Sequence, residues 1–262
     1  MSGSEGGLFS RRSLLLGGGA MIAAGAGAYG LVRALTPTNN SGFKPVSYSF
    51  DETGQCVLTA SMTEGPYYVD EALVRRDIRD GRPGVETLLR LKIADSKTCE
   101  AVPGALVDIW HCDAEGNYSA SPALGTEQRT SDGHLKPIND DRFLRGRQVA
   151  NVDGIVEFVT IYPGWYRGRT PHIHMKVQVG EREVATSQMF FAKELSAEVY
   201  AAPPYVTKGA ADTTNDNDHV LYSARGGDGA WPKMVRDGER LVGTLTVGVA
   251  RATDLAALRV SP

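Results

Sequence analysis

The chain carries short runs of apolar residues that are separated by turns rich in Gly, Pro and Asp. In residues 105–110 apolar and polar side chains alternate imperfectly, and in residues 155–159 one of the two faces is clearly the more apolar. Neighbouring side chains of a strand point to opposite faces, so this pattern is typical of the half-buried strands of a sandwich. It predicts strands at residues 88–94, 105–111, 154–161, 172–179, 184–191 and 241–249.

Helical segments are expected to be few and short. Residues 193–200 can form a short helix before Pro203 and Pro204 end it, and residues 254–258 are a weaker candidate. No internal repeat interrupts the pattern. We therefore predict an all-β fold, a β-sandwich with short helices and with long loops that carry the active site.

The first 35 residues differ from the rest and predict a targeting segment. Arg11 and Arg12 precede three leucines and an uncharged stretch rich in Gly and Ala, which resembles a twin-arginine export signal. An ordinary general-secretion signal is the alternative, because it also begins with positive charge. The many glycines suit a permanent membrane helix poorly, but an uncleaved leader would still anchor the protein to the membrane.

A linker and a single domain are expected after this leader. Residues 36–47 are polar and rich in structure breakers, so the globular domain is expected at residues 48–262, exported to the periplasm or the exterior. With 42% hydrophobic and 23% charged residues, the composition fits one domain of ordinary packing. The net charge of −3, without a basic segment interleaved with aromatic residues, argues against nucleic acid as a partner.

Three cysteines, Cys56, Cys99 and Cys112, fall within the exported part of the chain. An oxidising compartment permits one disulfide among them and leaves one thiol over, and the spacing alone does not say which two pair. No CxxC motif is present, so a thiolate zinc site or an iron–sulfur cluster has little support.

Two histidines give the first indication of chemistry. His172 and His174 lie two residues apart on a predicted strand, so both imidazoles face the same side and could hold one metal ion. Such a pair taken alone is more often structural. The remaining histidines complete no zinc or iron(II) motif, so other ligands have to come from other residue types.

Two tyrosines are candidates for these other ligands. Tyr166 lies in a glycine-flanked loop just before the histidine pair, and Tyr118 ends the segment of residues 108–118. Either tyrosine alone is more often a buried aromatic residue with a hydrogen-bonded hydroxyl group.

A series of motifs from about residue 56 to residue 191 resembles the intradiol ring-cleavage dioxygenases, the family of protocatechuate and catechol dioxygenases. The motifs, in order, are TEGPYY at 63–68, DIW at 108–110, GNY at 116–118, DG at 153–154, PGWY at 163–166, RTPHIH at 169–174 and SQMFF at 187–191. The resemblance implies a β-sandwich, in agreement with the strand pattern.

The resemblance also implies a set of site residues. The two tyrosinate ligands of the family fall on Tyr118 and Tyr166, and its two histidine ligands fall on His172 and His174. The active-site arginine of the family falls on Arg169, and its glutamine falls on Gln188. Residues Tyr67, Tyr68 and Trp165 are expected near the pocket. With Tyr118 as a ligand, a disulfide from Cys112 would constrain the ligand loop, so a bond between Cys56 and Cys99 is favoured.

The two tyrosines and two histidines are a suitable ligand set for Fe(III). A free phenol has a pKa of about 10, so two phenolates at neutral pH require a hard ion of high charge. Two phenolates and one hydroxide then balance the three positive charges of the ferric ion. The resemblance implies that Tyr166 leaves the metal when a catechol binds, that Arg169 stabilises the carbanion-like substrate, and that Gln188 orients or supports it.

The predicted function is cleavage of a catechol-type ring by dioxygen between its hydroxyl-bearing carbons, giving a muconate-type diacid. Two alternatives are a sandwich that binds catechols without turnover, such as a sensor, and a zinc hydrolase that uses the histidine pair. The loop between Tyr166 and His172 is shorter than in protocatechuate enzymes, and the helical dimerisation region of catechol enzymes is replaced by leader and linker. The ring substituents and the assembly, including a homo-oligomer, therefore stay open.

Overall fold

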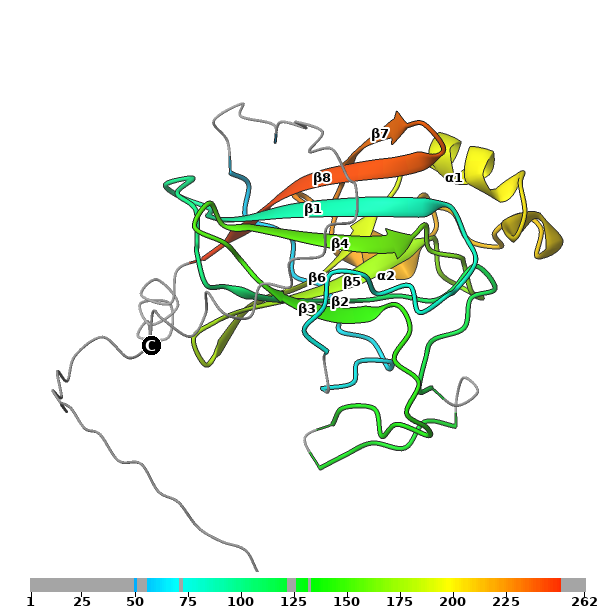
Figure 1. The fold of residues 1–262 in the computed structure, drawn as a ribbon, viewed down its shortest axis with the longest axis horizontal. Helices are drawn as coiled ribbons and strands as arrows, with labels where there is room; N and C mark the ends of the chain where they lie inside the picture. Colours follow the sequence, from blue (N-terminus) through cyan, green and yellow to red (C-terminus); the bar gives the residue numbers. More distant parts are fainter. Residues whose placement is uncertain (1–49, 51–55, 71–72, 122–125, 132, 251–262) are drawn as a thin grey trace, which may run out of the picture. The chain divides into compact units, whose positions relative to one another are not determined.

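The computed structural model describes residues 50, 56–70, 73–121, 126–131 and 133–250 (Figure 1). They fall within one unit of the chain, Ser47–Pro262. The predicted leader at 1–35, the linker at 36–47 and the weaker helix candidate at 254–258 lie outside the described residues.

Two four-stranded sheets make up the described part of the chain. One sheet has the order β4-β1-β8-β7 and contains Ile155–Ile161, Glu86–Asp95, Arg240–Val249 and Lys233–Asp237. The other has the order β3-β2-β5-β6 and contains Arg145–Val149, Leu106–Trp110, His172–Val179 and Arg182–Phe190. All neighbours pair antiparallel except β1 and β8, which are parallel. Figure 1 shows the two sheets stacked, so the fold is the predicted all-β sandwich.

The main core lies between the two sheets and decides which way β5 faces. Ile173 and Met175 of β5 are fully buried and share one apolar cluster with Leu89 and Leu91 of β1. Because side chains alternate along a strand, the histidines of β5 must point to the opposite face of their sheet. Loops that follow β2 and β4 cover this opposite face, together with residues 63–68.

The helices are short, as predicted. Helix α1 spans Lys193–Tyr200, a 3₁₀ turn spans Tyr205–Thr207, and α2 spans His219–Ser223. The prediction for 193–200 is confirmed at both ends. Helix α2 begins at Asp218, whose carboxylate accepts hydrogen bonds from the Val220 and Leu221 amides. Within the described ranges, no helix is long and apolar enough to span a membrane.

All six predicted strands are present, with ends that differ by at most two residues. Strands β3 and β7 were not predicted. Both lie at the edge of a sheet, and their sequences RGRQV and KMVRD are largely polar, so they carry no apolar alternation to detect.

The structure joins Cys56 and Cys99 in a disulfide with a Cα–Cα distance of 5.3 Å and leaves Cys112 as a buried free thiol. This is the pairing favoured from the sequence, because a bond from Cys112 would constrain the predicted ligand loop. The bond ties the start of the described domain to the turn that follows β1.

Candidate active site

Four donor atoms from three parts of the chain meet on the outer face of the β3-β2-β5-β6 sheet. His172 and His174 stand at the start of β5, Tyr118 comes from the loop after β2, and Tyr166 comes from the loop after β4. The His174 Nε2 atom lies 3.1 Å from the Tyr118 Oη atom and 3.1 Å from His172 Nε2. The His172 Nε2 atom in turn lies 3.2 Å from Tyr166 Oη. The structure therefore brings together all four residues that the sequence predicts as ligands.

The imidazoles are held so that their Nε2 atoms face this cluster. The Nδ1 atom of His172 lies 2.7 Å from the carbonyl oxygen of Thr170, and a carbonyl can only accept. His172 therefore carries its proton on Nδ1 and presents the lone pair of Nε2. The ring of His174 stacks on Trp110, with centroids 5.0 Å apart and an interplanar angle of 7°. Its buried Nδ1 atom has no hydrogen-bond partner among the described residues.

Burial sets the protonation of the four groups. It lowers the pKa of His172 to about 3, with help from the nearby Arg169 cation, and it holds the pKa of His174 well below its usual value. Both imidazoles are thus neutral at physiological pH. Burial also raises the pKa of Tyr166 to about 12 and the pKa of Tyr118 well above its usual value. Without a cation, both tyrosines are neutral phenols.

The arrangement fits a hard, highly charged metal ion. Two neutral imidazole nitrogens at 3.1 Å present lone pairs toward each other unless a cation or a proton lies between them. Two phenols beside them can supply negative charge only to an ion strong enough to displace their protons. Elsewhere in the described chain, no group of three or more His, Cys, Asp or Glu side chains could hold a metal ion.

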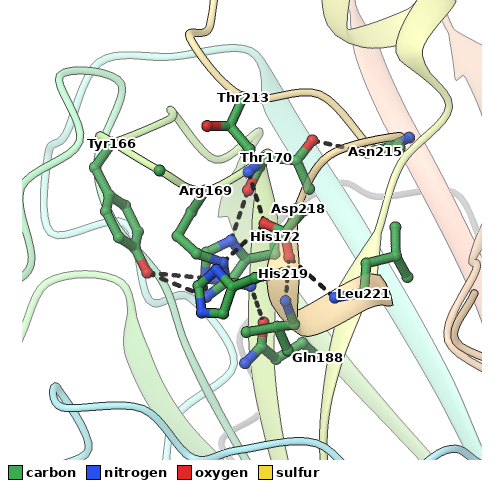
Figure 2. A network of polar contacts seen from close by, with 12 residues as sticks. Tyr166, Arg169, Thr170, His172, Gln188, Thr213, Asn215, Asp218, His219 and Leu221 are labelled. Carbon is green, nitrogen blue, oxygen red and sulfur yellow. Dashed lines mark hydrogen bonds and ion pairs between the residues drawn. The ribbon is translucent and has the colours of Figure 1, made fainter. Parts of the chain in front are cut away.

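Arg169 lies against this donor cluster and is almost fully buried. Its Nη1 atom lies 3.4 Å from Tyr166 Oη and 3.3 Å from His172 Nε2, and its Nη2 atom donates to Gln188 Oε1. The Nε atom donates to Asp218 at 2.8 Å (Figure 2). Gln188 is itself held by a 2.9 Å hydrogen bond from Nε2 to the carbonyl oxygen of Thr63. The predicted arginine and glutamine are therefore present and in contact.

A second buried arginine lies beneath Tyr118. Arg145 is 5% exposed and donates to the Ser119 hydroxyl, to the Ser119 carbonyl and to the Tyr67 carbonyl. Its guanidinium carbon lies 5.9 Å from the centroid of the Tyr118 ring. It forms no ion pair with a described carboxylate, and burial lowers its pKa to about 10. Arg169, in contrast, is neutralised by Asp218.

The three aromatic residues expected near the pocket have different positions. The Tyr67 ring stacks on Tyr118 with centroids 4.4 Å apart and meets the edge of Tyr166 at 6.1 Å, so it lies at the site. Tyr68 packs on Trp110, and its hydroxyl group donates to Asp108. Trp165 instead donates to the carbonyl oxygen of Gly209, in the segment after α1.

Three residues of the site were not predicted from the sequence: Thr63, Arg145 and Asp218. A signal for Asp218 does exist, because an aspartate before an apolar segment is a common helix N-cap. Its contact with Arg169 spans 49 residues and depends on the tertiary fold. Arg145 lies on β3, the polar edge strand that the sequence pattern also missed.

Comparison with known proteins shows which family the chain resembles in sequence and in structure. Residues 63–208 match the family model described as Dioxygenase. An intradiol ring-cleavage dioxygenase from Tetranychus urticae is 30% identical, with a TM-score of 0.68, over 74% of this chain and 95% of that one. The dioxygenase domain of a dioxygenase carbohydrate-binding protein fusion from Streptomyces sp. SirexAA-E is 23% identical, with a TM-score of 0.52, over 74% and 99% of the two chains.

A curated relative, chlorocatechol 1,2-dioxygenase from Rhodococcus opacus, is 26% identical over 159 residues. The match covers 51% of this chain and 56% of the relative. The matched part of this chain therefore spans little more than half the length of that enzyme.

Proposed function

Because the chain belongs to the intradiol ring-cleavage dioxygenase family, we propose that it uses Fe(III) and dioxygen to cleave a catechol-type ring between its two hydroxyl-bearing carbons. The product would be a muconate-type diacid. One observation carries the proposal: Tyr118, Tyr166, His172 and His174 bring their donor atoms together through contacts of 3.1, 3.1 and 3.2 Å.

These four residues would hold the iron. When bound, the ferric ion would act as a Lewis acid that draws electron density from the catecholate and opens a ring carbon to dioxygen. The protein supplies two neutral imidazoles and two phenolates, which with one hydroxide balance the charge of the ion. This balance favours the ferric state.

Tyr166 is proposed as the ligand that makes room for the substrate. It is less buried than Tyr118, and it does not share the stacking contact that Tyr118 makes with Tyr67. A chelating catechol has to lose two protons as it binds, and the Tyr166 Oη atom is placed to accept one of them. Tyr118 would keep its position throughout.

Arg169 would stabilise the negative charge that develops on the ring. Its Nη1 atom already faces Tyr166 Oη and His172 Nε2, so the cation lies where an iron-bound catecholate would come close to it. Gln188 binds Nη2 of the same guanidinium and so supports this arrangement. Dry, buried surroundings make such a charge interaction stronger than it would be in water.

Metal analysis combined with dioxygen uptake tests the proposal. The purified protein should contain close to one iron per chain, show the burgundy colour of an iron(III)–tyrosinate charge-transfer band, and consume dioxygen when catechol, protocatechuate or hydroxyquinol is added. A colourless zinc protein would contradict the iron site. A coloured iron protein that consumes no dioxygen with any of the three would contradict the enzymatic function and favour a catechol sensor.

A further inference from the structure

Residues 212–218 clamp the loop that carries Arg169. Four hydrogen bonds connect the two segments. Figure 2 shows Asp218 beside Arg169 and Thr170. The Gly168 amide donates to Asp212 at 3.1 Å, and the Thr170 hydroxyl donates to Asn215 at 2.7 Å. Asp218 makes the other two bonds, to the Thr170 amide and to the Arg169 side chain. The loop between Tyr166 and β5 is therefore held from outside by a segment far away in sequence.

The carboxylate of Asp218 is completely buried, and each of its oxygens accepts two hydrogen bonds. Its Oδ2 atom accepts from Arg169 Nε at 2.8 Å and from the Thr170 amide at 2.9 Å. Its Oδ1 atom accepts from the first amides of α2, at 2.9 and 3.0 Å. Burial alone would raise the pKa of Asp218, yet the hydrogen bonds from Arg169 and from these amides hold it below the ordinary value. One side chain thus joins the start of α2 to the candidate active site.

The geometry of a guanidinium group explains why this contact matters. The nitrogens of the group lie in one plane, so fixing two of them fixes the direction of the third. Asp218 occupies Nε and Gln188 occupies Nη2, which leaves Nη1 directed at Tyr166 and His172. An arginine that lost the Asp218 contact could rotate about its long side chain and withdraw Nη1 from the reacting atoms.

We propose that Asp218 is the positioning residue for Arg169, because it binds Nε in a buried ion pair and thereby aims Nη1 at the site of ring cleavage. The proposal rests on the proposed function, in which Arg169 stabilises charge on the substrate. Asp218 forms no hydrogen bond to a proposed metal ligand, and its proposed effect on catalysis runs through Arg169.

Asp218→Asn tests the proposal because asparagine still caps a helix. With its oxygen on the α2 amides, the new side chain turns an NH₂ group toward Arg169 Nε, so two donors face each other. We expect kcat to fall roughly tenfold to a hundredfold, as for a misplaced catalytic group, while KM changes by less than about threefold. Iron content and the charge-transfer band should be unchanged. Asp218→Ser, which also caps α2, provides a second variant if the first folds poorly.

A double-mutant cycle separates positioning from general damage. If Asp218 acts only through Arg169, adding D218N to R169A should lower kcat by less than about twofold, because the group that it positions is already absent. A further loss as large as in the wild-type background would overturn the proposal. Asp108→Asn is the control, since it weakens the ion pair between buried Asp108 and the partly exposed Arg147 without contact to Arg169. It should leave kcat within about twofold of wild type.

A measurement without turnover keeps this proposal distinct from the proposed function. The Nε–H of Arg169 is buried and hydrogen-bonded, so its hydrogen exchange in the metal-free protein, followed by NMR, should be at least about tenfold faster in D218N. Unchanged exchange would overturn the positioning role even in an active enzyme. A wild-type protein that consumed no dioxygen would contradict the proposed function instead, whatever the exchange rates.

Discussion

At the scale of single residues, the two candidate tyrosine ligands differ in their surroundings. Tyr118 is stacked against Tyr67, and the guanidinium carbon of Arg145 lies 5.9 Å from the centroid of its ring. Tyr166 meets Tyr67 only at its edge and borders Arg169, whose charge is already balanced by Asp218. Tyr118 is therefore the more firmly packed of the two tyrosines, which agrees with the proposal that Tyr166 leaves.

Substitution of each tyrosine by phenylalanine should give different results. Tyr166→Phe should still bind iron, with a changed charge-transfer colour and with turnover reduced but not abolished, because a proton-accepting ligand is lost. Tyr118→Phe should lose ferric iron more readily, since a neutral ring leaves charge on the ion uncompensated. Iron stoichiometry, visible spectrum and dioxygen uptake of each variant provide the measurements. Full activity of Tyr166→Phe with an unchanged spectrum would show that this tyrosine is only a packing residue.

Gly65 lies against one of the histidines. Its φ angle is +75°, and a Cβ atom there would come within 3.2 Å of His174 Cε1. Gly65→Ala should therefore displace the ring and speed iron loss to a chelator, in addition to a backbone strain of about 1–2 kcal/mol. Gly81→Ala is the matched control, with φ of +74° and open space around the position. Equal iron retention in the two variants would show that the His174 contact is unimportant.

At the scale of elements, strand alternation divides β5 into a core face and a site face. Ile173 and Met175 enter the sandwich, while the histidines point outward beneath the loops. These loops bury polar groups that form hydrogen bonds with specific partners. His111, at the end of β2, is fully buried, with its ring nitrogens 2.8 Å from the Cys112 carbonyl and 2.7 Å from the Thr160 hydroxyl.

Buried neutral histidines should make the metal-free protein sensitive to acid. Burial lowers the pKa of His111 from 6.5 to about 4, so the unfolded chain takes up a proton at a pH where the native state does not. Stability is therefore present above pH 6.5 and falls as the pH drops toward 4, by up to about 1.4 kcal/mol per pH unit for this residue.

Urea unfolding of metal-free protein between pH 7 and pH 4 measures the effect. His111→Gln should be less stable than wild type at pH 7 but should show a shallower loss of stability with acid. Parallel curves for wild type and variant would mean that His111 does not contribute to the acid sensitivity.

At the scale of the whole molecule, the two sheets form the support for the candidate active site, whose residues lie on one sheet and on the long loops that cover it. The disulfide between Cys56 and Cys99 links residues 43 apart in sequence, and neither cysteine belongs to the candidate active site. Its effect should therefore be on the stability of the fold, while the proposed iron ligands are held by other contacts.

Removal of the disulfide tests whether it stabilises the fold without affecting catalysis. Replacing Cys56 and Cys99 by serine should lower the free energy of unfolding by about 2–4 kcal/mol, as for a loop of this length, with kcat nearly unchanged. Denaturant unfolding and dioxygen uptake on the same sample check both parts. Non-reducing peptide mapping that found three free thiols in the native protein would contradict the bond itself.

Export is a property of the whole chain, and we propose that it follows the twin-arginine route. That machinery reads both arginines, whereas a general signal needs only positive charge. Replacing Arg11 and Arg12 by lysine should therefore leave folded protein in the cytoplasm, as fractionation and immunoblotting would show. Export of the doubly substituted chain at the full rate would favour the general-secretion alternative.

The sequence by itself determined the fold class, six of the strands and the helix at 193–200, and it named six candidate site residues. These features have local signals, since alternation marks a strand and the motif RTPHIH places Arg169 and both histidines within one short segment. The resemblance to a known family then connected Tyr118 and Gln188 to that segment.

Only the tertiary structure decided how the site is held in place. Strands β3 and β7 are polar edge strands, and nothing local marks them. The contacts of Arg145 with Tyr67 and of Asp218 with Arg169 join residues 78 and 49 positions apart. Such contacts exist because the sandwich brings distant loops to one face, and burial there makes an unpartnered charge or polar group costly. The candidate ligands can therefore be named from the sequence, while their alignment depends on tertiary packing.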